Sequence, residues 1–312
     1  MSQVLRTNPS RPDRGKLHYS SCVQFFLVHA ACLLAFWSGV SAVAVFVCLA
    51  LYVVRMFAIT AGFHRLFAHR TYRTGRAFQF LLAFTGTASY QKGPLWWASH
   101  HRRHHLHSDT ERDLHSPLAH TVWQSHVGWF LCRDSLATDL SLVPNLTKYR
   151  ELRLLDRYYP APPAALALAT FALGAALGRY APGLGTSGFQ MLVWGFFIST
   201  VLLYHGTFTV NSLAHIFGRR RFETGDNSRN NLFVAIITLG EGWHNNHHHY
   251  PSSERQGFYW WEIDVAHYAL RLLSLVGIVR DIRTPPRRVY RLPTPAAPAG
   301  DDATRLSQPR SA

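Results

Sequence analysis

Residues 22–54 of this chain contain no Asp, Glu, Lys or Arg. A membrane-spanning helix needs about 20 apolar residues, so this uncharged run is too long for one such helix. The Trp37-Ser38-Gly39 step in its middle is a natural turn. We therefore predict two antiparallel membrane spans, at about 21–37 and 40–57, with one long tilted span as the alternative.

A second pair of apolar segments lies at about 162–179 and 188–206. Pro162 and Pro163 favour a helix that begins there, because proline is tolerated in the first helical turn. Residues 76–98 are moderately apolar but interrupted by polar side chains, which indicates an interfacial or re-entrant helix rather than a fifth span. The sequence thus predicts an all-α integral membrane protein with four transmembrane helices in two hairpins.

Positive charge is distributed unevenly along the chain. Lys and Arg number 32 against 17 Asp and Glu, which gives a net charge of +15. The connectors within the two hairpins hold almost none of it, whereas the N-terminus, residues 65–160 and everything after about 216 hold nearly all of it. The positive-inside rule then predicts a multi-pass protein with both termini and both long polar segments in the cytoplasm. We assign the charge to lipid head groups and expect no nucleic-acid partner.

These patterns divide the chain into three parts. Residues 1–20 are expected to form a basic cytosolic N-terminus, and residues 21–283 a single membrane domain. Residues 284–312 are rich in Pro, Ala and Arg, a composition that predicts a disordered tail. Aromatic residues reach 13% of the whole chain, which excludes disorder throughout.

The 19 histidines are strongly clustered. Two boxes read H-x2-H-H, and on a helix positions i, i+3 and i+4 share one face, so each box turns three imidazoles toward one point. An N-x3-H motif has the same property. His64 and His69 are five residues apart and diverge on an ideal α-helix, so we expect them to straddle a helix end or to reach two different metals. The box residues are His64, His69, His101, His104, His105, Asn211, His215, His244, His247 and His248.

Clustered imidazoles serve metal binding, proton relay or no function at all. Repeated boxes that each follow an apolar span favour metal binding. Nine box histidines exceed the four ligands of one tetrahedral site, whereas two metal ions with four or five imidazoles each fit the number. Imidazole suits Zn, Cu, Fe and Ni, so the residue type alone does not name the metal.

These boxes and their apolar flanks resemble the membrane fatty acid desaturase family, and within it the acyl-CoA (stearoyl-CoA-type) Δ9 desaturases in a bacterial form without a fused cytochrome b5. The resemblance covers roughly residues 22–275. The stretches that carry it are 60–69, 97–105, 125–129, 211–215 and 240–248.

The resemblance implies a cytosolic helical cap that holds a histidine-ligated di-iron centre above four membrane helices. All nine box histidines would be iron ligands, and Asn211 would complete the shell directly or through water. The implied reaction converts a saturated acyl chain to a cis-unsaturated one, with O2 as co-substrate and two electrons. Iron suits this reaction because, unlike zinc, it changes oxidation state. No catalytic residue is expected apart from the metal centre.

The sequence departs from the acyl-CoA branch at Ser99-His100, where that branch has an Arg-Asp pair that helps to hold the CoA head group. We keep acyl-CoA as the expected substrate, with acyl-lipid and acyl-carrier-protein substrates as alternatives. Electrons are expected from a separate partner of the ferredoxin or cytochrome b5 type with its reductase, for which a basic face is suited. Candidates to bind a head-group phosphate are Arg102, Arg103, Arg219 and Arg220, although such charge runs are more often lipid-facing.

Carboxylates near the boxes are candidates to orient the ligands, because a metal-bound histidine usually donates its second ring N–H to such a group. We favour Asp113 and Glu241 for this role over a solvated acid or a helix cap, and Asp109 and Glu111 are further candidates. A membrane hydroxylase on the same scaffold is the rival enzyme. A metal transporter is the rival of another class, but it predicts ligands near the midplane of the spans, whereas these boxes follow the spans.

Overall fold

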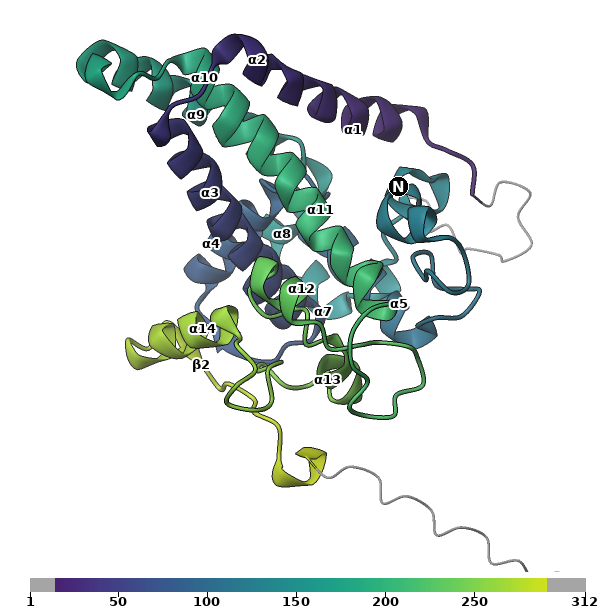
Figure 1. Cartoon of the computed structure of the whole chain (residues 1–312). Coiled ribbons are helices and arrows are strands. Elements are labelled where there is room, and N and C mark those ends of the chain that lie inside the picture. The colour runs from purple at the N-terminus through teal and green to yellow at the C-terminus, as the bar shows by residue number, and fades with distance from the viewer. Residues whose placement is uncertain (1–14, 291–312) are drawn as a thin grey trace, which may run out of the picture.

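The computed structural model describes residues 15–290. Figure 1 shows long helices that run side by side and a cap of shorter helices and loops at one end. Within the described residues, four helices are long and apolar enough to cross a membrane, which confirms the all-α membrane fold. They cover Tyr19–Ser38, Ala42–Ala68, Ala161–Tyr180 and Gly188–His215.

The first hairpin comprises α1 (Tyr19–Ala31), a 3-10 turn (Cys32–Leu34), α2 (Ala35–Ser38) and α3 (Ala42–Phe57). Its turn lies where the sequence predicts it, because α2 ends at Ser38 and Gly39 takes a positive φ of 69°. Ser41 then caps α3 by accepting a hydrogen bond from the backbone N–H of Ala44, as N-cap serines commonly do. The alternative of one long span is therefore wrong.

The second hairpin comprises α9 (Ala161–Tyr180), α10 (Gly188–Leu192), a π-helix (Val193–Ile198) and α11 (Ser199–Asn211). The 3-10 turns Pro182–Leu184 and Leu213–His215 flank this second part. At Gly174 of α9 an added Cβ would lie 2.3 Å from the backbone oxygen of Ser187. The two helices of this hairpin therefore pack at a distance that only glycine permits.

Two of the spans extend beyond their predicted ends at residues 57 and 206. Helix α3 continues into a π-helix over Ala58–Ala68, and α11 continues to Asn211 and the turn that ends at His215. Both extensions carry box residues. The predicted spans are too short because they stop where the polar histidines begin, whereas the helices continue through them. The membrane helices thus deliver their own metal-ligand candidates.

The predicted interfacial helix at 76–98 is in fact two helices, α4 (Arg76–Thr87) and α5 (Pro94–His107). Between them Tyr90 and Lys92 take positive φ angles of 64° and 67°, which a helix cannot accommodate. Pro94 then begins α5 at its first position, as prolines often do.

The rest of the cap consists of short elements. A two-residue strand β1 (Arg73–Thr74) pairs with β2 (Val279–Arg280) in antiparallel register, with Arg73 opposite Arg280. This pairing joins the segment after the first π-helix to the segment after α14. The other cap helices are α6 (Trp129–Leu131), α7 (Pro144–Thr147), α8 (Arg150–Arg157), α12 (Leu232–Ile237), α13 (His244–His249) and α14 (Val265–Leu275), with a π-helix at Gln124–Gly128 and 3-10 turns at Arg133–Ser135, Leu140–Leu142 and Arg287–Tyr290.

The main apolar core packs the Ala58–Ala68 π-helix against α4, α5 and α8. Phe63 and Phe67 of the π-helix are buried there, and burial stabilises each side chain by roughly 2 kcal/mol. Gly86 of α4 allows this contact, because a Cβ at that position would lie 2.5 Å from the Phe63 ring. The core therefore fixes the helix that bears the first histidine box.

The predicted start of the disordered tail, at residue 284, lies too early in the chain. Residues 287–290 form a 3-10 turn, and Val289 is buried against Phe222 and Phe258. Its apolar side chain finds a pocket in the cap, so composition alone misplaced this boundary. The rest of the predicted tail, 291–312, and the first 14 residues of the N-terminal segment lie outside the described residues.

Candidate metal centre

A first group of five histidines converges between the spans and the cap. Their ring nitrogens lie within 4.8 Å of one another. The Nε2 atoms of His69 and His101 are 2.7 Å apart, and those of His105 and His247 are 2.9 Å apart. The members are His64, His69, His101, His105 and His247, which come from the first π-helix, its C-terminal cap, α5 and α13.

The π-helix explains how His64 and His69 meet. A π-helix closes i to i+5 hydrogen bonds, and the backbone N–H of His69 donates to the carbonyl of His64 at 3.1 Å. Residues five apart therefore share a face here, and the two rings are 4.8 Å apart between centroids. His69 caps the end of this helix, and the two histidines lie in one group rather than in two.

A second group of four histidines lies beside the first. The Nε2 atoms of His215 and His244 are 3.0 Å apart. Helices α5 and α13 supply members to both groups, and the rings of His105 and His248 are 4.5 Å apart across the boundary. The members of this group are His104, His215, His244 and His248.

Carboxylates fix the orientation of four of these rings. Asp113, Asp109 and Asp226 accept hydrogen bonds from the Nδ1–H of His104, His215 and His248, which leaves the Nε2 lone pair of each ring directed into the group. Glu241 lies against Nδ1 of His64, which the Gln256 amide also contacts at 3.1 Å. The four pairs are His64–Glu241 at 2.5 Å, His104–Asp113 at 2.9 Å, His215–Asp109 at 3.0 Å and His248–Asp226 at 2.5 Å.

The nitrogen-to-nitrogen contacts test whether a metal fits. With Nδ1 protonated, as these carboxylates require, the facing Nε2 lone pairs repel one another unless a cation lies between them. A metal–nitrogen bond of about 2.1 Å at right angles places neighbouring nitrogens about 3.0 Å apart, which matches the observed 2.7–3.1 Å. The Nε2 atom of His248 is buried with no hydrogen-bond partner. The donor set therefore fits two metal ions with nitrogen ligands.

The electrostatics keep most of the rings in the neutral form that binds metal. Burial holds the pKa of His101, His105 and His244 well below the usual value. Burial also acts to lower the pKa of His104, but the Asp113 carboxylate outweighs it and raises that pKa. For Asp109 burial acts in the opposite direction, yet the His215 hydrogen bond lowers its pKa to about 2, so it is a permanent carboxylate.

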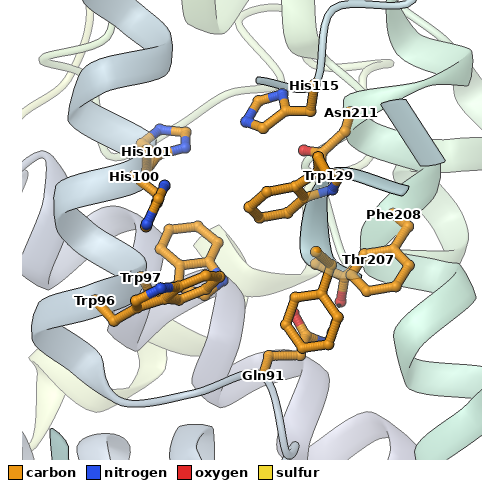
Figure 2. Close-up of a pocket in the computed structure, with 11 residues that line it drawn as sticks. Gln91, Trp96, Trp97, His100, His101, His115, Trp129, Thr207, Phe208 and Asn211 are labelled. Atoms are coloured by element: carbon orange, nitrogen blue, oxygen red, sulfur yellow. Dashed lines mark hydrogen bonds between the residues drawn. The ribbon is translucent and has the colours of Figure 1, made fainter. Parts of the chain in front are cut away.

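A pocket with mostly apolar walls borders the first group at His101. Figure 2 shows His115 and Asn211 at one end of this pocket, His101 and His100 along one side, and Gln91 at the other end. The amide of Gln91 donates to Thr207 Oγ1 at 3.1 Å. A second cavity shares Trp97, His101, Thr207 and Asn211 with it and is bordered by His64, His104 and His244. The other walls of the pocket in Figure 2 are mainly Trp96, Trp129, Phe130 and Phe208.

Comparison with known proteins identifies the family. The model of the fatty acid desaturase family matches residues 40–276. The chain belongs to the fatty acid desaturase family. It is therefore an oxidoreductase of lipid metabolism. This family generally uses two iron ions and O2, which agrees with a donor set for two ions.

Individual relatives of this desaturase differ in their substrates. It is 37% identical over 276 residues to the sn-1 stearoyl-lipid 9-desaturase of Anabaena variabilis, covering 86% of this chain and 95% of the relative. It is 36% identical over 246 residues to the palmitoyl-monogalactosyldiacylglycerol delta-7 desaturase of Arabidopsis thaliana, covering 78% and 62%. It is 36% identical over 231 residues to the icosanoyl-CoA 5-desaturase of Limnanthes douglasii, covering 73% and 61%. The chain thus spans less than two thirds of both plant relatives.

Asn211, the tenth predicted ligand of the desaturase, ends α11 one turn before His215. Its backbone carbonyl accepts a hydrogen bond from Ser125 at 2.9 Å, and its side chain borders the pocket opposite His101 (Figure 2). This position is compatible with completion of the second group, and the ligand role stays a prediction.

The four arginines predicted to bind a head group have different surroundings. Arg102 donates to the carbonyls of Phe67, Ala68 and Leu142 at 2.6–2.9 Å, so its donors hold the cap onto the first π-helix and are not available to a phosphate. Arg103 lies 3.5 Å from Asp139. Arg220 binds the carbonyl of Asp226, and Arg219 is exposed. A head-group role stays a prediction for these last three.

Two features of the site have no clear signal in the sequence. Asp226 holds His248 from a loop that contains no box, so no spacing points to it. Arg65 is buried and contacts three carboxylates, those of Glu241, Glu254 and Asp264, at 2.9–3.3 Å. Only its place next to His64 within an apolar stretch marks it in the sequence.

Proposed function

We propose that this desaturase inserts a cis double bond into a saturated fatty acyl chain at a di-iron centre with O2 as co-substrate. The observation that carries the proposal is two adjacent all-histidine groups beside an apolar pocket. Two electrons come from the acyl chain and two from a donor, and together with two protons from the acyl chain and two from solvent they reduce O2 to two waters. O2 is the oxidant, and bound iron would activate it, because iron changes oxidation state and is suited to imidazole.

The protein's part is to hold the ions and to position the chain. The first histidine group would hold one ion, and the second group with Asn211 would hold the other. An alkyl chain has no polar handle, so its position depends on the shape of an apolar cavity. The aromatic walls around Trp97 and Trp129 supply that shape and exclude water from the reacting carbons.

We propose Δ9 as the position of the double bond and acyl-CoA as the substrate, with acyl-lipid as the second candidate. The second candidate has support of its own, because the Anabaena variabilis relative that aligns along 95% of its length is named as a stearoyl-lipid 9-desaturase. Two parallel reactions separate the candidates. Both contain the purified enzyme and a reduced donor, but one receives stearoyl-CoA and the other receives stearoyl-glycerolipid. Turnover of the lipid alone would reject the acyl-CoA assignment.

We propose that the termini and the metal centre lie on the cytoplasmic side, and that a ferredoxin or cytochrome b5 with its reductase supplies electrons there. Figure 1 shows α2 and α10 at the end of the bundle away from α5 and α13. The two weakly charged connectors are therefore at one end and the basic, histidine-bearing cap is at the other, which fits the positive-inside rule.

The function is tested by expressing the chain in an unsaturated-fatty-acid auxotroph and analysing its fatty acids by gas chromatography–mass spectrometry. We expect a new cis-monounsaturated acid that is lost with His104→Ala. His107→Ala is the matched control, because His107 lies on the same helix and in neither histidine group. A hydroxylated product would identify the rival hydroxylase, and a product that persists in His104→Ala would reject the metal centre.

A further inference from the structure

A basic cavity of about 700 Å³ lies in the cap, and none of its lining residues borders the pocket beside the histidine groups. Three segments that are distant in the sequence form it: 70–74, 145–149 and 281–283. The strand pair β1–β2 joins the first and third of these, and the backbone N–H of Arg283 donates to the carbonyl of Thr71 at 2.9 Å. The cavity is therefore a fixed part of the fold.

The lining of this cavity carries four cations and one acid. Arg73 lies 3.4 Å from Asp281, and both side chains are exposed, so this pair neutralises little. Within residues 15–290, no carboxylate pairs with Arg70, Lys148 or Arg283. Like charges in one cavity repel one another, so the arrangement favours an anion that binds between them.

A neutral hydrogen-bond donor adds to the cations. Gln79 of α4 lines the cavity, and its Nε2 is buried with no hydrogen-bond partner. A buried donor without a partner is costly unless a ligand or water satisfies it. An oxyanion would satisfy the amide and the neighbouring guanidinium and ammonium groups at once.

The surroundings of the cavity place it at the membrane surface. Helix α4, which begins beside it, packs against the membrane helices α3 and α9 and exposes Phe80 and Leu81. Helix α14, which leads to β2 on the other side, exposes Leu272 and Leu275. Amphipathic helices of this kind lie in the interface with their apolar side chains among the lipid tails. The cavity thus has lipid-facing apolar surface on both flanks.

We propose that this cavity binds the phosphate of an anionic membrane phospholipid, with the acyl tails along the exposed faces of α4 and α14. Arginine and lysine are the usual phosphate partners, and the tails account for the apolar flanks, which a free phosphate would not use. The site goes beyond the proposed function, because it is separate from the substrate pocket and its occupant is not consumed.

The test measures binding of labelled phosphatidylglycerol and phosphatidylcholine to the purified full-length enzyme in mixed detergent micelles, without turnover. We expect phosphatidylglycerol to bind more tightly, and Lys148→Gln with Arg283→Gln to weaken it roughly tenfold to thirtyfold, since each cation near the surface contributes by a factor of about five. The matched control, Arg157→Gln with Arg112→Gln, removes the same charge from exposed positions that neither line the cavity nor lie on α4 or α14 and should weaken binding less than about twofold.

Several outcomes would overturn the proposal. An equal loss in both double variants would show general attraction to the basic surface. Displacement of the lipid by millimolar inorganic phosphate would make the cavity a free-phosphate site. Unchanged lipid binding with weaker binding of an acidic electron donor would make it a protein-docking site. Lys148→Arg should retain binding, which distinguishes the lost charge from misfolding because Lys148 is exposed.

Discussion

The Asp226→Asn variant gives a quantitative test of whether the second histidine group holds a metal ion. The Asp226 carboxylate accepts a hydrogen bond from His248 Nδ1 at 2.5 Å, and its other oxygen accepts from Ser228 N and Oγ at 3.0 and 2.6 Å. Burial alone would raise the pKa of Asp226, but the hydrogen bond from His248 and those from Ser228 hold it well below its usual range. Asp226 is therefore a carboxylate that accepts on both sides.

An asparagine at this position can accept on one side only. If its oxygen faces Ser228, its amide donates toward His248 and forces the ring proton onto Nε2, the atom that faces the second group. If the amide is flipped, the donors of Ser228 lose their acceptor. Loss of such an outer partner lowers metal affinity by about 10–100-fold, equivalent to about 1.4–2.7 kcal/mol.

The assay measures iron per protein after dialysis against graded chelator, together with the yield of unsaturated acid. We expect Asp226→Asn to lose its iron at a chelator concentration about 10–100-fold lower than the wild-type enzyme does. Its activity should fall in parallel. Asp134→Asn is the control, because Asp134 binds the backbone N–H of Gly15 and belongs to neither metal group. Wild-type iron affinity in Asp226→Asn, with loss in His248→Ala, would refute the reasoning.

Three further predictions concern the fold. Arg65→Met should leave three buried carboxylates without their cation and lower the free energy of unfolding by about 3–5 kcal/mol. Its control, Arg76→Gln, breaks an exposed pair and should lower that free energy by less than about 1 kcal/mol. Equal losses in thermal unfolding would contradict this. Gly174→Ala should destabilise the enzyme by about 1–3 kcal/mol, and Gly183→Ala, which has open space around it, should not; matching melting temperatures would refute the close packing. Burial raises the pKa of Asp156 to about 6 against the hydrogen bonds from two backbone N–H groups, so only the folded state holds this proton between pH 4 and 6. The stability it contributes is present below about pH 4 and lost as the pH rises through 6, by about 3 kcal/mol, and Asp156→Asn should lack this loss in unfolding curves measured at both pH values.

The spans and the histidine boxes could be predicted because their signals are local. A run without charges that is longer than one bilayer requires a turn, and Gly39 supplies it. The i, i+3, i+4 spacing predicts that the three imidazoles of a box point to one place, but the structure divides this box: His101 and His105 lie in the first group and His104 lies in the second. That division depends on where the partner helices lie, and no spacing within one box contains that information.

Other parts of the site depend on tertiary contacts. The Ala58–Ala68 π-helix differs from an α-helix by one residue per hydrogen-bonded ring, and its sequence has no mark of this. Asp226 contacts His248 from a loop, and the packing of the cap sets the path of that loop. Arg102 is a predicted phosphate contact, yet the carbonyls that it binds come from 67–68 and 142, far from it in the sequence.

Because α5 and α13 each supply histidines to both groups, two metal ions bound there would not be thermodynamically independent. An ion in the first group would order the turns that carry His104, His244 and His248, so a second ion would meet histidines whose conformational entropy is already reduced. Such coupling is reciprocal. The centre should therefore fill and empty as a unit, and an enzyme population short of iron should divide into fully loaded and empty molecules rather than half-loaded ones.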